Sequence, residues 1–332
     1  MSSPNRTTDF IARTDPHGPA IAWPALRVHE GFEILADRQP AAPAVISDGG
    51  VLTYAELDRK ANAMAHALLA HGVTTEEAVG VLTGRSGSLP LAFLAILKAS
   101  GAYVPMGANL PAQRLANMAT QSRMRFLIAL DELEPPAELL AVLAGNARGT
   151  APAVLRPEEL NREALARDGH RPNRPGKATD LAAILFTSGS TGQPKGVLLQ
   201  HDACINMGYC HIDAQKIGPD DRLLLAAAPG FIMGFRELCL PILAGAAFVP
   251  ASRALLDDPS GLLAAMSRHR VTVSMFTPSY QRHLRDRSHE RPGDQASAGR
   301  TRRQLSCSLA GGESRQREVR LRFQFAGTPH GA

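Results

Sequence analysis

Short apolar runs alternate with amphipathic segments of helical spacing along most of this chain. The runs of strand length cover residues 78–83, 102–105, 126–130, 181–186, 222–228, 246–249 and 271–276. Other segments have apolar residues at every third or fourth position, or have helix-start and helix-end residues at their boundaries. These segments cover residues 54–71, 90–100, 111–122, 201–215, 235–243 and 262–269. Because strands and helices alternate in this way when helices connect parallel strands, the pattern predicts an α/β fold.

Turn and capping residues mark the ends of the first helices. Thr53 and Glu56 have the spacing of a capping box, and Gly72 follows the helix that this box would open. Pro90 is typical of a first helical turn, and Gly101 stands just beyond the end of the segment that it opens. These signals predict helices over 54–71 and 90–100.

Composition divides the chain into three parts. Residues 1–27 are rich in Ser, Thr, Pro and Gly and predict a disordered arm. Residues 28–280 carry the alternating pattern, and residues 281–332 form a basic segment that we expect to be poorly ordered or divergent. Within the middle part, residues 131–179 are polar and interrupted by Pro and Gly, which favours a junction between two α/β lobes. Ligands of open α/β sheets bind in crevices at such places.

The apolar run at 181–186 leads directly into the string TSGSTGQPKG at 187–196. Glycines let backbone N–H groups approach an anion, hydroxyls add donors, and a lysine adds a positive charge. The sequence therefore predicts a site for a phosphate chain, formed by Thr187, Ser188, Gly189, Ser190, Thr191, Gly192 and Lys195. The string has neither the Gly-Lys-Ser/Thr ending of a Walker A loop nor the glycine spacing of a dinucleotide fold. A mobile Ser/Gly linker is the alternative interpretation.

Net charge gives little support to nucleic-acid binding. The 332 residues include 36 basic and 31 acidic side chains, and the 44% apolar content is enough for a substantial core. Residues 281–332 contain 11 Arg, no Lys and 5 acidic residues, so the positive excess lies entirely in this segment. Because the segment lacks interleaved aromatic residues and any recognition motif, we do not predict a nucleic-acid partner.

Cysteine spacing and hydropathy argue against zinc, disulfides and a membrane anchor. The four cysteines have no C-x-x-C spacing, and the group of His201, Cys204, Cys210 and His211 lacks the spacing of a zinc site. No metal ligand is therefore assigned. The chain opens without a signal peptide, and each long apolar stretch is shorter than the roughly 18 residues of a membrane span. We expect a cytoplasmic location and no membrane contact.

Three further strings lie in order along the chain: LTYAEL at 52–57, LKASGAYVP at 97–105 and RL at 114–115. Together with the loop at 187–196, they resemble the core motifs of the adenylate-forming superfamily, which includes acyl-CoA synthetases, luciferases and adenylation domains of nonribosomal peptide synthetases. The resemblance covers about residues 28–280. It implies an incomplete large N-terminal domain of such an enzyme, with two lobes of mixed or parallel sheet flanked by helices.

The segment PGFIMG at 229–234 resembles the fourth core motif of adenylation domains. The resemblance places Phe231 and Ile232 in the acyl pocket. Amino-acid-activating domains have an aspartate at the position of Ile232, where it pairs with the substrate's α-ammonium group. Burying that ammonium without a partner costs several kcal/mol, so we expect a carboxylic acid without an α-amino group, such as a fatty, aryl or keto acid. The alternative is that Ile232 is an ordinary core residue.

By resemblance, the activity would be ATP-dependent and Mg²⁺-dependent formation of an acyl-adenylate, followed by transfer to a thiol. The expected partners are a small carboxylic acid and either a carrier protein or a complementing C-terminal polypeptide. Past residue 280 only AGGE at 310–313 resembles the family. The adenine motif, the ribose-binding aspartate and the catalytic lysine of the small C-terminal domain have no counterpart, so no catalytic residue is assigned and truncation is expected to impair activity. The alternative is an inactive nucleotide-binding remnant or an interaction module.

Overall fold

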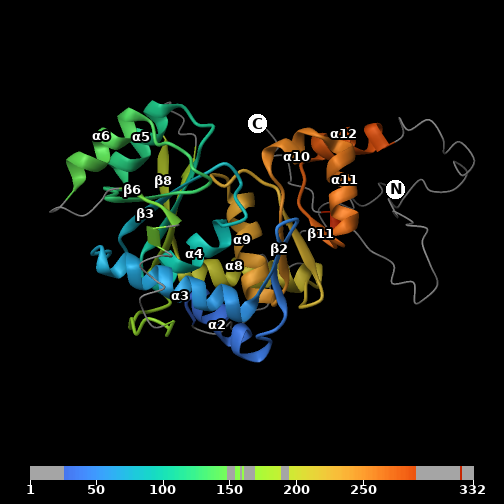
Figure 1. Cartoon of the computed structure of the whole chain (residues 1–332), viewed down its shortest axis with the longest axis horizontal. Helices are drawn as coiled ribbons and strands as arrows, with labels where there is room; N and C mark the ends of the chain where they lie inside the picture. The colour runs from blue at the N-terminus through green and yellow to red at the C-terminus, as the bar shows by residue number, and fades with distance from the viewer. Residues whose placement is uncertain are drawn as a thin grey trace, which may run out of the picture.

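Two six-stranded sheets with helices packed against them make up the described part of the chain (Figure 1). The structure is a computed structural model that describes residues 26–147, 154–157, 159–160, 169–187, 194–288 and 322–323. Each sheet is parallel except for one antiparallel pair at an edge. The predicted α/β class, with two lobes of mixed sheet flanked by helices, is confirmed.

The first sheet carries the predicted phosphate site at one edge. Its strand order is β6-β5-β3-β4-β7-β8. In chain order the strands are β3 (Ala78–Thr83), β4 (Ala102–Gly107), β5 (Phe126–Ala129), β6 (Val154–Leu155), β7 (Leu181–Thr187) and β8 (Lys195–Gln200). All residues of β3 and β4 are buried, as expected for central parallel strands that are covered on both faces.

The second sheet contains strands from both ends of the described chain, at its two opposite edges. Its order is β12-β11-β9-β10-β1-β2. Its strands are β1 (Pro43–Ser47), β2 (Gly50–Thr53), β9 (Arg222–Leu225), β10 (Ala247–Pro250), β11 (Val273–Ser274) and β12 (Arg322–Phe323). Strand β1 pairs parallel with β10 and antiparallel with β2, so an N-terminal hairpin completes a sheet that otherwise comes from residues beyond 221.

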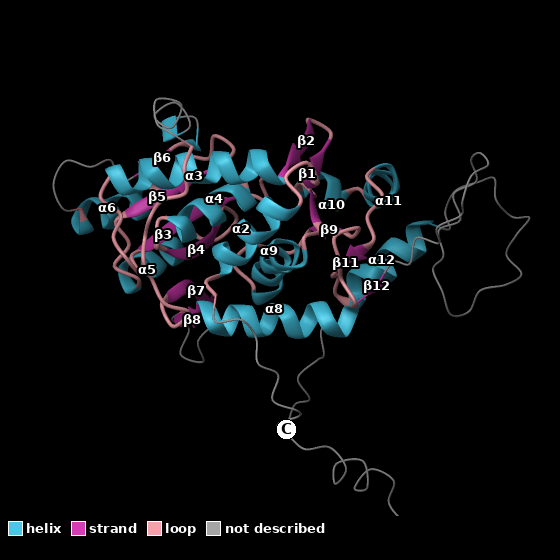
Figure 2. Cartoon of the chain, turned by 90° about the horizontal axis from the view of Figure 1, so that it is seen from below, coloured by secondary structure: helices cyan, strands magenta, loops and turns pink. Residues whose placement is uncertain are grey.

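Helices connect the strands, and some of them pack between the two sheets while the others cover the outer face of each sheet. They are α2 (Val28–Arg38), α3 (Tyr54–Ala70), α4 (Leu89–Lys98), α5 (Ala112–Gln121), α6 (Ala137–Asn146), α8 (His201–Gln215), α9 (Ile232–Ala244), α10 (Arg253–Asp257), α11 (Pro259–Arg268) and α12 (Pro278–Ser288). Figure 2 shows α8 running along one side of the molecule, from β7 and β8 toward the end that holds β12. Helix α12 crosses residue 280, where the composition places the start of the basic segment.

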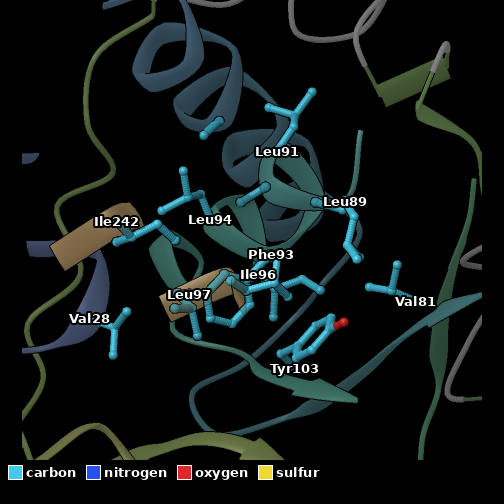
Figure 3. Packing of buried hydrophobic residues seen from close by; sticks show 14 of the residues in the cluster. Val28, Val81, Leu89, Leu91, Phe93, Leu94, Ile96, Leu97, Tyr103 and Ile242 are labelled. Carbon is cyan, nitrogen blue, oxygen red and sulfur yellow. The ribbon is translucent and has the colours of Figure 1, made fainter. Parts of the chain in front are cut away.

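Helix α4 is buried along its whole length and joins the two lobes. The ring of Phe93 lies 5.0 Å from that of Tyr103 on β4 and 5.8 Å from that of Phe235 on α9. Figure 3 shows the side chains of α4 gathered with Tyr103, with Ile242 of α9 and with Val28 of α2. Because each fully buried large apolar side chain contributes about 1.5–3 kcal/mol, this shared core fixes one lobe against the other.

An ion-pair network under α4 fastens the segment before β7. The side chain of Lys98 is completely buried and pairs with Glu33 and, at 2.8 Å, with Asp58. Arg171 binds the same Asp58 at 3.1 Å and Asp37 at 2.7 Å. The predicted loop at 171–177 is thus tied to α2 and α3, which places the start of β7.

The structure reproduces most predicted elements but shortens two strands. The capping box of α3 is present: the Thr53 amide donates to Glu56 at 2.8 Å, and the Glu56 amide donates to Thr53 Oγ1 at 3.3 Å. The predicted strand at 222–228 ends at Leu225, because the next two amides donate to the carboxyl of Glu237 instead of a neighbouring strand. The strand at 271–276 forms only at 273–274.

Several elements form where the periodicity does not predict them: α2, the β1–β2 hairpin, α6, β6, β8 and α10. Strand β8 shows the reason. Five of its six residues are exposed, so it has no alternation of buried and exposed positions to mark it. It forms because the backbone groups on the free edge of its buried partner β7 can pair with a second strand. This pairing of backbone groups is independent of the side-chain pattern.

Candidate functional site

The hairpin of β7 and β8 holds the two ends of the predicted phosphate loop. Thr187 is the last residue of β7, Lys195 is the first of β8, and the two are paired in the strand register. The Thr187 hydroxyl donates to the Lys195 carbonyl at 3.4 Å. Both residues are exposed. The hydroxyl of Thr187 and the ammonium of Lys195 therefore belong to the same edge of the sheet, on either side of the connecting loop.

The remaining residues of the predicted phosphate site, Ser188, Gly189, Ser190, Thr191 and Gly192, lie outside the described residues. The structure describes the two strands that hold the ends of this segment. A strand that is buried from Ala182 to Phe186 enters the loop, and an antiparallel strand leaves it. This strand-loop-strand arrangement contrasts with a Walker A loop, which leads into a helix.

A cavity of about 810 Å³ lies between the two lobes, and the predicted acyl-pocket residues line it. Its apolar wall comes from Ala226, Ala227, Ala228, Phe231, Ile232, Met233, Leu256, Met275 and Phe276. Its polar wall comes from Arg85, His211, Arg236, Arg253, Asp257, Thr277 and Tyr280. Several of these residues follow the carboxyl ends of β3, β9 and β11, which is where open α/β sheets bind their ligands.

Phe231 and Ile232 stand at the mouth of this cavity and are largely open to solvent. Phe231 is 68% exposed and Ile232 is 49% exposed. The alternative that Ile232 is an ordinary core residue is therefore wrong. Helix α9 begins at Ile232 rather than at the predicted residue 235. A side chain at Gly234 would put its Cβ only 2.5 Å from the carbonyl oxygen of Ala228, so glycine permits the tight turn that leads into the helix.

The buried carboxyl of Glu237 braces the floor of the cavity. Its Oε2 accepts hydrogen bonds from the amides of Ala226 and Ala227, each at 2.8 Å. Glu237 is 1% exposed, and burial raises its pKa to about 8 against the opposing effect of the two amides. The carboxyl is thus mostly protonated at neutral pH. No sequence motif marks this residue, because its role arises from its contact with the end of β9.

Arg85 reaches the cavity from the other lobe, in the loop after β3. Its Nε donates to the carbonyl of Ala226 at 2.8 Å, so the guanidinium contacts the same strand end that Glu237 braces. Its backbone has φ of +89°, a conformation that costs a non-glycine residue about 1 kcal/mol or more. Thr83 Oγ1 fixes this turn by accepting from the amides of Arg85 and Ser86, both at 3.2 Å.

Sequence reasoning missed Arg85, Arg236 and Arg253 as parts of this site. A charged residue in a loop after a strand, or at helical spacing in α9, has no distinctive pattern. Only the packing of the two lobes brings the three guanidinium groups to one cavity. Burial lowers the pKa of Arg85, with a further contribution from the charge of Arg253, and burial likewise lowers the pKa of Arg236. The guanidinium groups of Arg85 and Arg236 nevertheless remain charged at any ordinary pH.

In the His and Cys group of α8, His201 and Cys204 are buried in the core, Cys210 is exposed, and His211 lines the cavity. His201 Nδ1 accepts from the Val28 amide at 3.2 Å, and its ring contacts that of His29 at 5.7 Å. Burial, followed by the charge of Arg27, lowers the pKa of His201 to about 4. Among the described residues, no three His, Cys, Asp or Glu side chains group to hold a metal ion.

The helices in the described ranges contain none that is both long enough and apolar enough to cross a bilayer.

Comparison with known proteins gives a consistent result along most of the chain. The family profile of AMP-binding enzymes matches residues 32–329. Tyrocidine synthase 1 of Brevibacillus parabrevis is 31% identical over 257 residues, which are 77% of this chain and 23% of that protein. Malpinin synthetase of Mortierella alpina is 32% identical over 254 residues, which are 76% of this chain and 3% of that protein. The chain therefore spans a small fraction of the length of these relatives.

Solved structures of similar fold give the same result. The AMPPNP-bound form of the nonribosomal peptide synthetase FmoA3 superposes with a TM-score of 0.70 at 27% identity, covering 82% of this chain and 28% of that one. The N-terminal subdomain of Klebsiella oxytoca NpsA superposes with a TM-score of 0.66 at 25% identity, covering 80% of this chain and 64% of that one.

Proposed function

This chain belongs to the AMP-binding enzyme family, and we propose that its site activates a carboxylic acid with ATP to form an acyl-adenylate. The observation that carries the proposal is the β7–β8 hairpin, which fixes Thr187 and Lys195 at the two ends of a loop rich in Gly, Ser and Thr. Both side chains are open to solvent, so they are available to a polyphosphate. The similarity to an AMPPNP-bound synthetase supports ATP as the nucleotide.

In the proposed reaction, a carboxylate oxygen of the substrate attacks the α-phosphate of ATP. The bond from that phosphorus to the bridging oxygen breaks, and pyrophosphate leaves. The backbone amides of the loop and the ammonium of Lys195 would stabilise the charge on the departing phosphates, which is the main form of catalysis in phosphoryl and nucleotidyl transfer. The acyl group would then pass from the adenylate to a thiol, which loses its proton, as the acyl–phosphate bond breaks and AMP leaves; a carrier protein is the expected acceptor.

Mg²⁺ is implied by the family, but the described residues do not form a site for it. Loop amides and a lysine bind the phosphates themselves, whereas Mg²⁺ prefers carboxylates, water and phosphate oxygens. We therefore assign no step to the metal. When bound with ATP, it would neutralise part of the phosphate charge.

The acid would occupy the 810 Å³ cavity, with Phe231 and Ile232 at its mouth. An α-amino group is disfavoured there. Asp257 is the carboxylate among the described lining residues, and it pairs with Arg253 at 2.8 Å. An α-ammonium would therefore lack an uncommitted carboxylate in this lining and would face three guanidinium groups. This supports an acid without an α-amino group as the substrate.

ATP–pyrophosphate exchange with a panel of carboxylic acids tests the proposal. We expect exchange that requires an acid other than a proteinogenic α-amino acid and that falls at least tenfold in Lys195→Ala, since removing a preorganised charge from a transition state typically costs about that or more. Lys216→Ala is the matched control, because Lys216 follows α8 in an ion pair with Asp213 and lies outside the proposed machinery.

Two results would lead to different conclusions. ATP binding without exchange for any acid would refute activation by this chain alone and indicate a nucleotide-binding protein. Adding a separately produced C-terminal domain of a relative would then test complementation by a second polypeptide. Exchange that is greatest with an α-amino acid would refute the assignment of the substrate class.

A further inference from the structure

The described walls of the cavity carry more positive than negative charge. Arg85, Arg236 and Arg253 contribute three guanidinium groups, and Asp257 contributes one carboxylate. That carboxylate pairs with Arg253, which is 66% exposed at the rim. Arg85 and Arg236 are half-buried, and their pKa values are lowered mainly by burial. The described lining therefore has an excess of partly desolvated positive charge, which favours an anionic ligand.

Arg85 is the better defined of the two half-buried arginines. Its Nε donates to the carbonyl of Ala226, which also lines the cavity, and this bond fixes the guanidinium to the cavity wall. Within the described part of the chain, its two terminal nitrogens make no hydrogen bond. A guanidinium that is held by Nε and presents its terminal N–H groups is arranged to bind a carboxylate with two parallel hydrogen bonds.

We propose that the acid bound in this cavity carries a second anionic group, in the simplest case the distal carboxylate of a dicarboxylic acid, and that Arg85 binds it with the support of the nearby charge of Arg236. This inference rests on the proposed function, because it assumes that the cavity is the acid site. It narrows the proposed substrate class from any acid without an α-amino group to an acid that carries two negative charges. Apolar residues such as Ile232 and Met275 would contact the methylene chain.

The cavity volume agrees with an acid of this kind. A volume of about 810 Å³ lies within the usual range of about 300–1,000 Å³ for small-molecule sites. Glutaric acid and its monomethyl ester form a suitable pair of probes. They have the same carbon chain between their carbonyl groups and the same free carboxylate, but only the diacid has a charge at the far end.

Isothermal titration calorimetry of the whole chain with these two probes tests the inference without requiring catalysis. We expect glutarate to bind at least tenfold more tightly than the ester at low salt, with a smaller ratio at high salt. Arg85→Met should weaken glutarate binding about tenfold, Arg236→Met should weaken it less, and both should change ester binding less than twofold. Arg85→Lys should retain part of the preference.

The matched control is Arg268→Met, because Arg268 pairs with Asp48 on the surface and does not line the cavity. Thermal melting of each variant verifies that it is folded. Equal binding of glutarate and the ester, or a ratio unchanged in Arg85→Met, would overturn the inference. So would a tenfold loss of ATP affinity in Arg85→Met with glutarate binding intact, since the arginine would then serve the nucleotide phosphates.

These experiments distinguish failure of this inference from failure of the proposed function. Tight binding of glutarate that depends on Arg85, with no exchange of pyrophosphate for any acid, would support the inference and refute activation. Exchange with hexanoate or benzoate, together with equal binding of glutarate and its ester, would support activation and overturn the inference. No binding of any acid by folded protein would overturn both.

Discussion

Replacing Glu237 with glutamine should make the free energy of unfolding depend less strongly on pH. Glu237 is buried beneath the cavity, and its Oε2 accepts from the amides of Ala226 and Ala227. The side-chain oxygen of glutamine can accept the same two bonds. The other carboxyl oxygen of Glu237 has no hydrogen-bond partner among the described residues, so the amide nitrogen of glutamine and the hydroxyl of a protonated glutamate would be equally unsatisfied there. Below pH 5 the two proteins should therefore be about equally stable.

The magnitude follows from the pKa of Glu237, which burial raises from 4.5 to about 8. The folded protein holds this proton more tightly than the unfolded chain. The resulting contribution to the free energy of unfolding is therefore complete below pH 4.5 and is lost as the pH rises toward 8. At about 1.4 kcal/mol per pH unit, the loss amounts to roughly 3 kcal/mol by pH 7 and roughly 5 kcal/mol above pH 9.

Urea unfolding of wild type and Glu237→Gln at pH 5, 7 and 9 measures this effect. The free energy of unfolding of the variant, relative to wild type, should rise by about 4 kcal/mol between pH 5 and pH 9. Other titrating groups are common to both proteins and cancel in the difference. Val51→Ala is the control, because Val51 is 57% exposed and its side chain does not titrate, so the difference should be the same at every pH. A change below about 1 kcal/mol for Glu237→Gln would refute a buried, protonated Glu237.

Three further predictions concern other parts of the scaffold. Burial lowers the pKa of His201 to about 4, so stability should fall as the pH drops from 6.5 toward 4, by about 3 kcal/mol at most; His201→Gln should flatten this part of the urea profile, and an unchanged slope would contradict it. Lys98→Met should cost about 3 kcal/mol in urea unfolding, because it leaves Asp58 buried without its ammonium partner; adding Asp58→Asn should restore part of the loss. Gly234→Ala should cost about 1–3 kcal/mol, because its Cβ would lie 2.5 Å from the Ala228 carbonyl, and calorimetry should show weaker acid binding in the folded variant.

The helices with local signals were predictable because their information is contained in a few adjacent residues. The capping box of Thr53 and Glu56 forms as the sequence predicts, and the buried strand β3 matches its apolar run. Strand β8 could not be predicted in this way, because five of its six residues are exposed and it depends on the edge of β7. The early end of β9 likewise depends on Glu237, eleven residues beyond Ala226.

The same distinction between local and long-range information applies to the candidate site. Composition and order of residues at 187–196 were enough to predict a phosphate loop, since the glycines, hydroxyls and lysine occur in one short string. Phe231 and Ile232 were identified from a local motif, and the structure adds that they stand at the mouth of a cavity. The grouping of the arginines could not be predicted from the sequence, because Arg85 and Arg236 are 151 residues apart and belong to different lobes.

Local sequence patterns were sufficient for the α/β class and for recognising the adenylate-forming family, and they predict a phosphate loop at 187–196. Such features are carried by periodicity and short strings, which act over a few residues. Three features depend on the three-dimensional packing: the positive charge of the described cavity lining, the contact of Arg85 with the end of β9, and the burial that raises the pKa of Glu237. Charge, burial and proton affinity depend on what surrounds a side chain, and those surroundings arise only when the buried core around α4 brings the two lobes together.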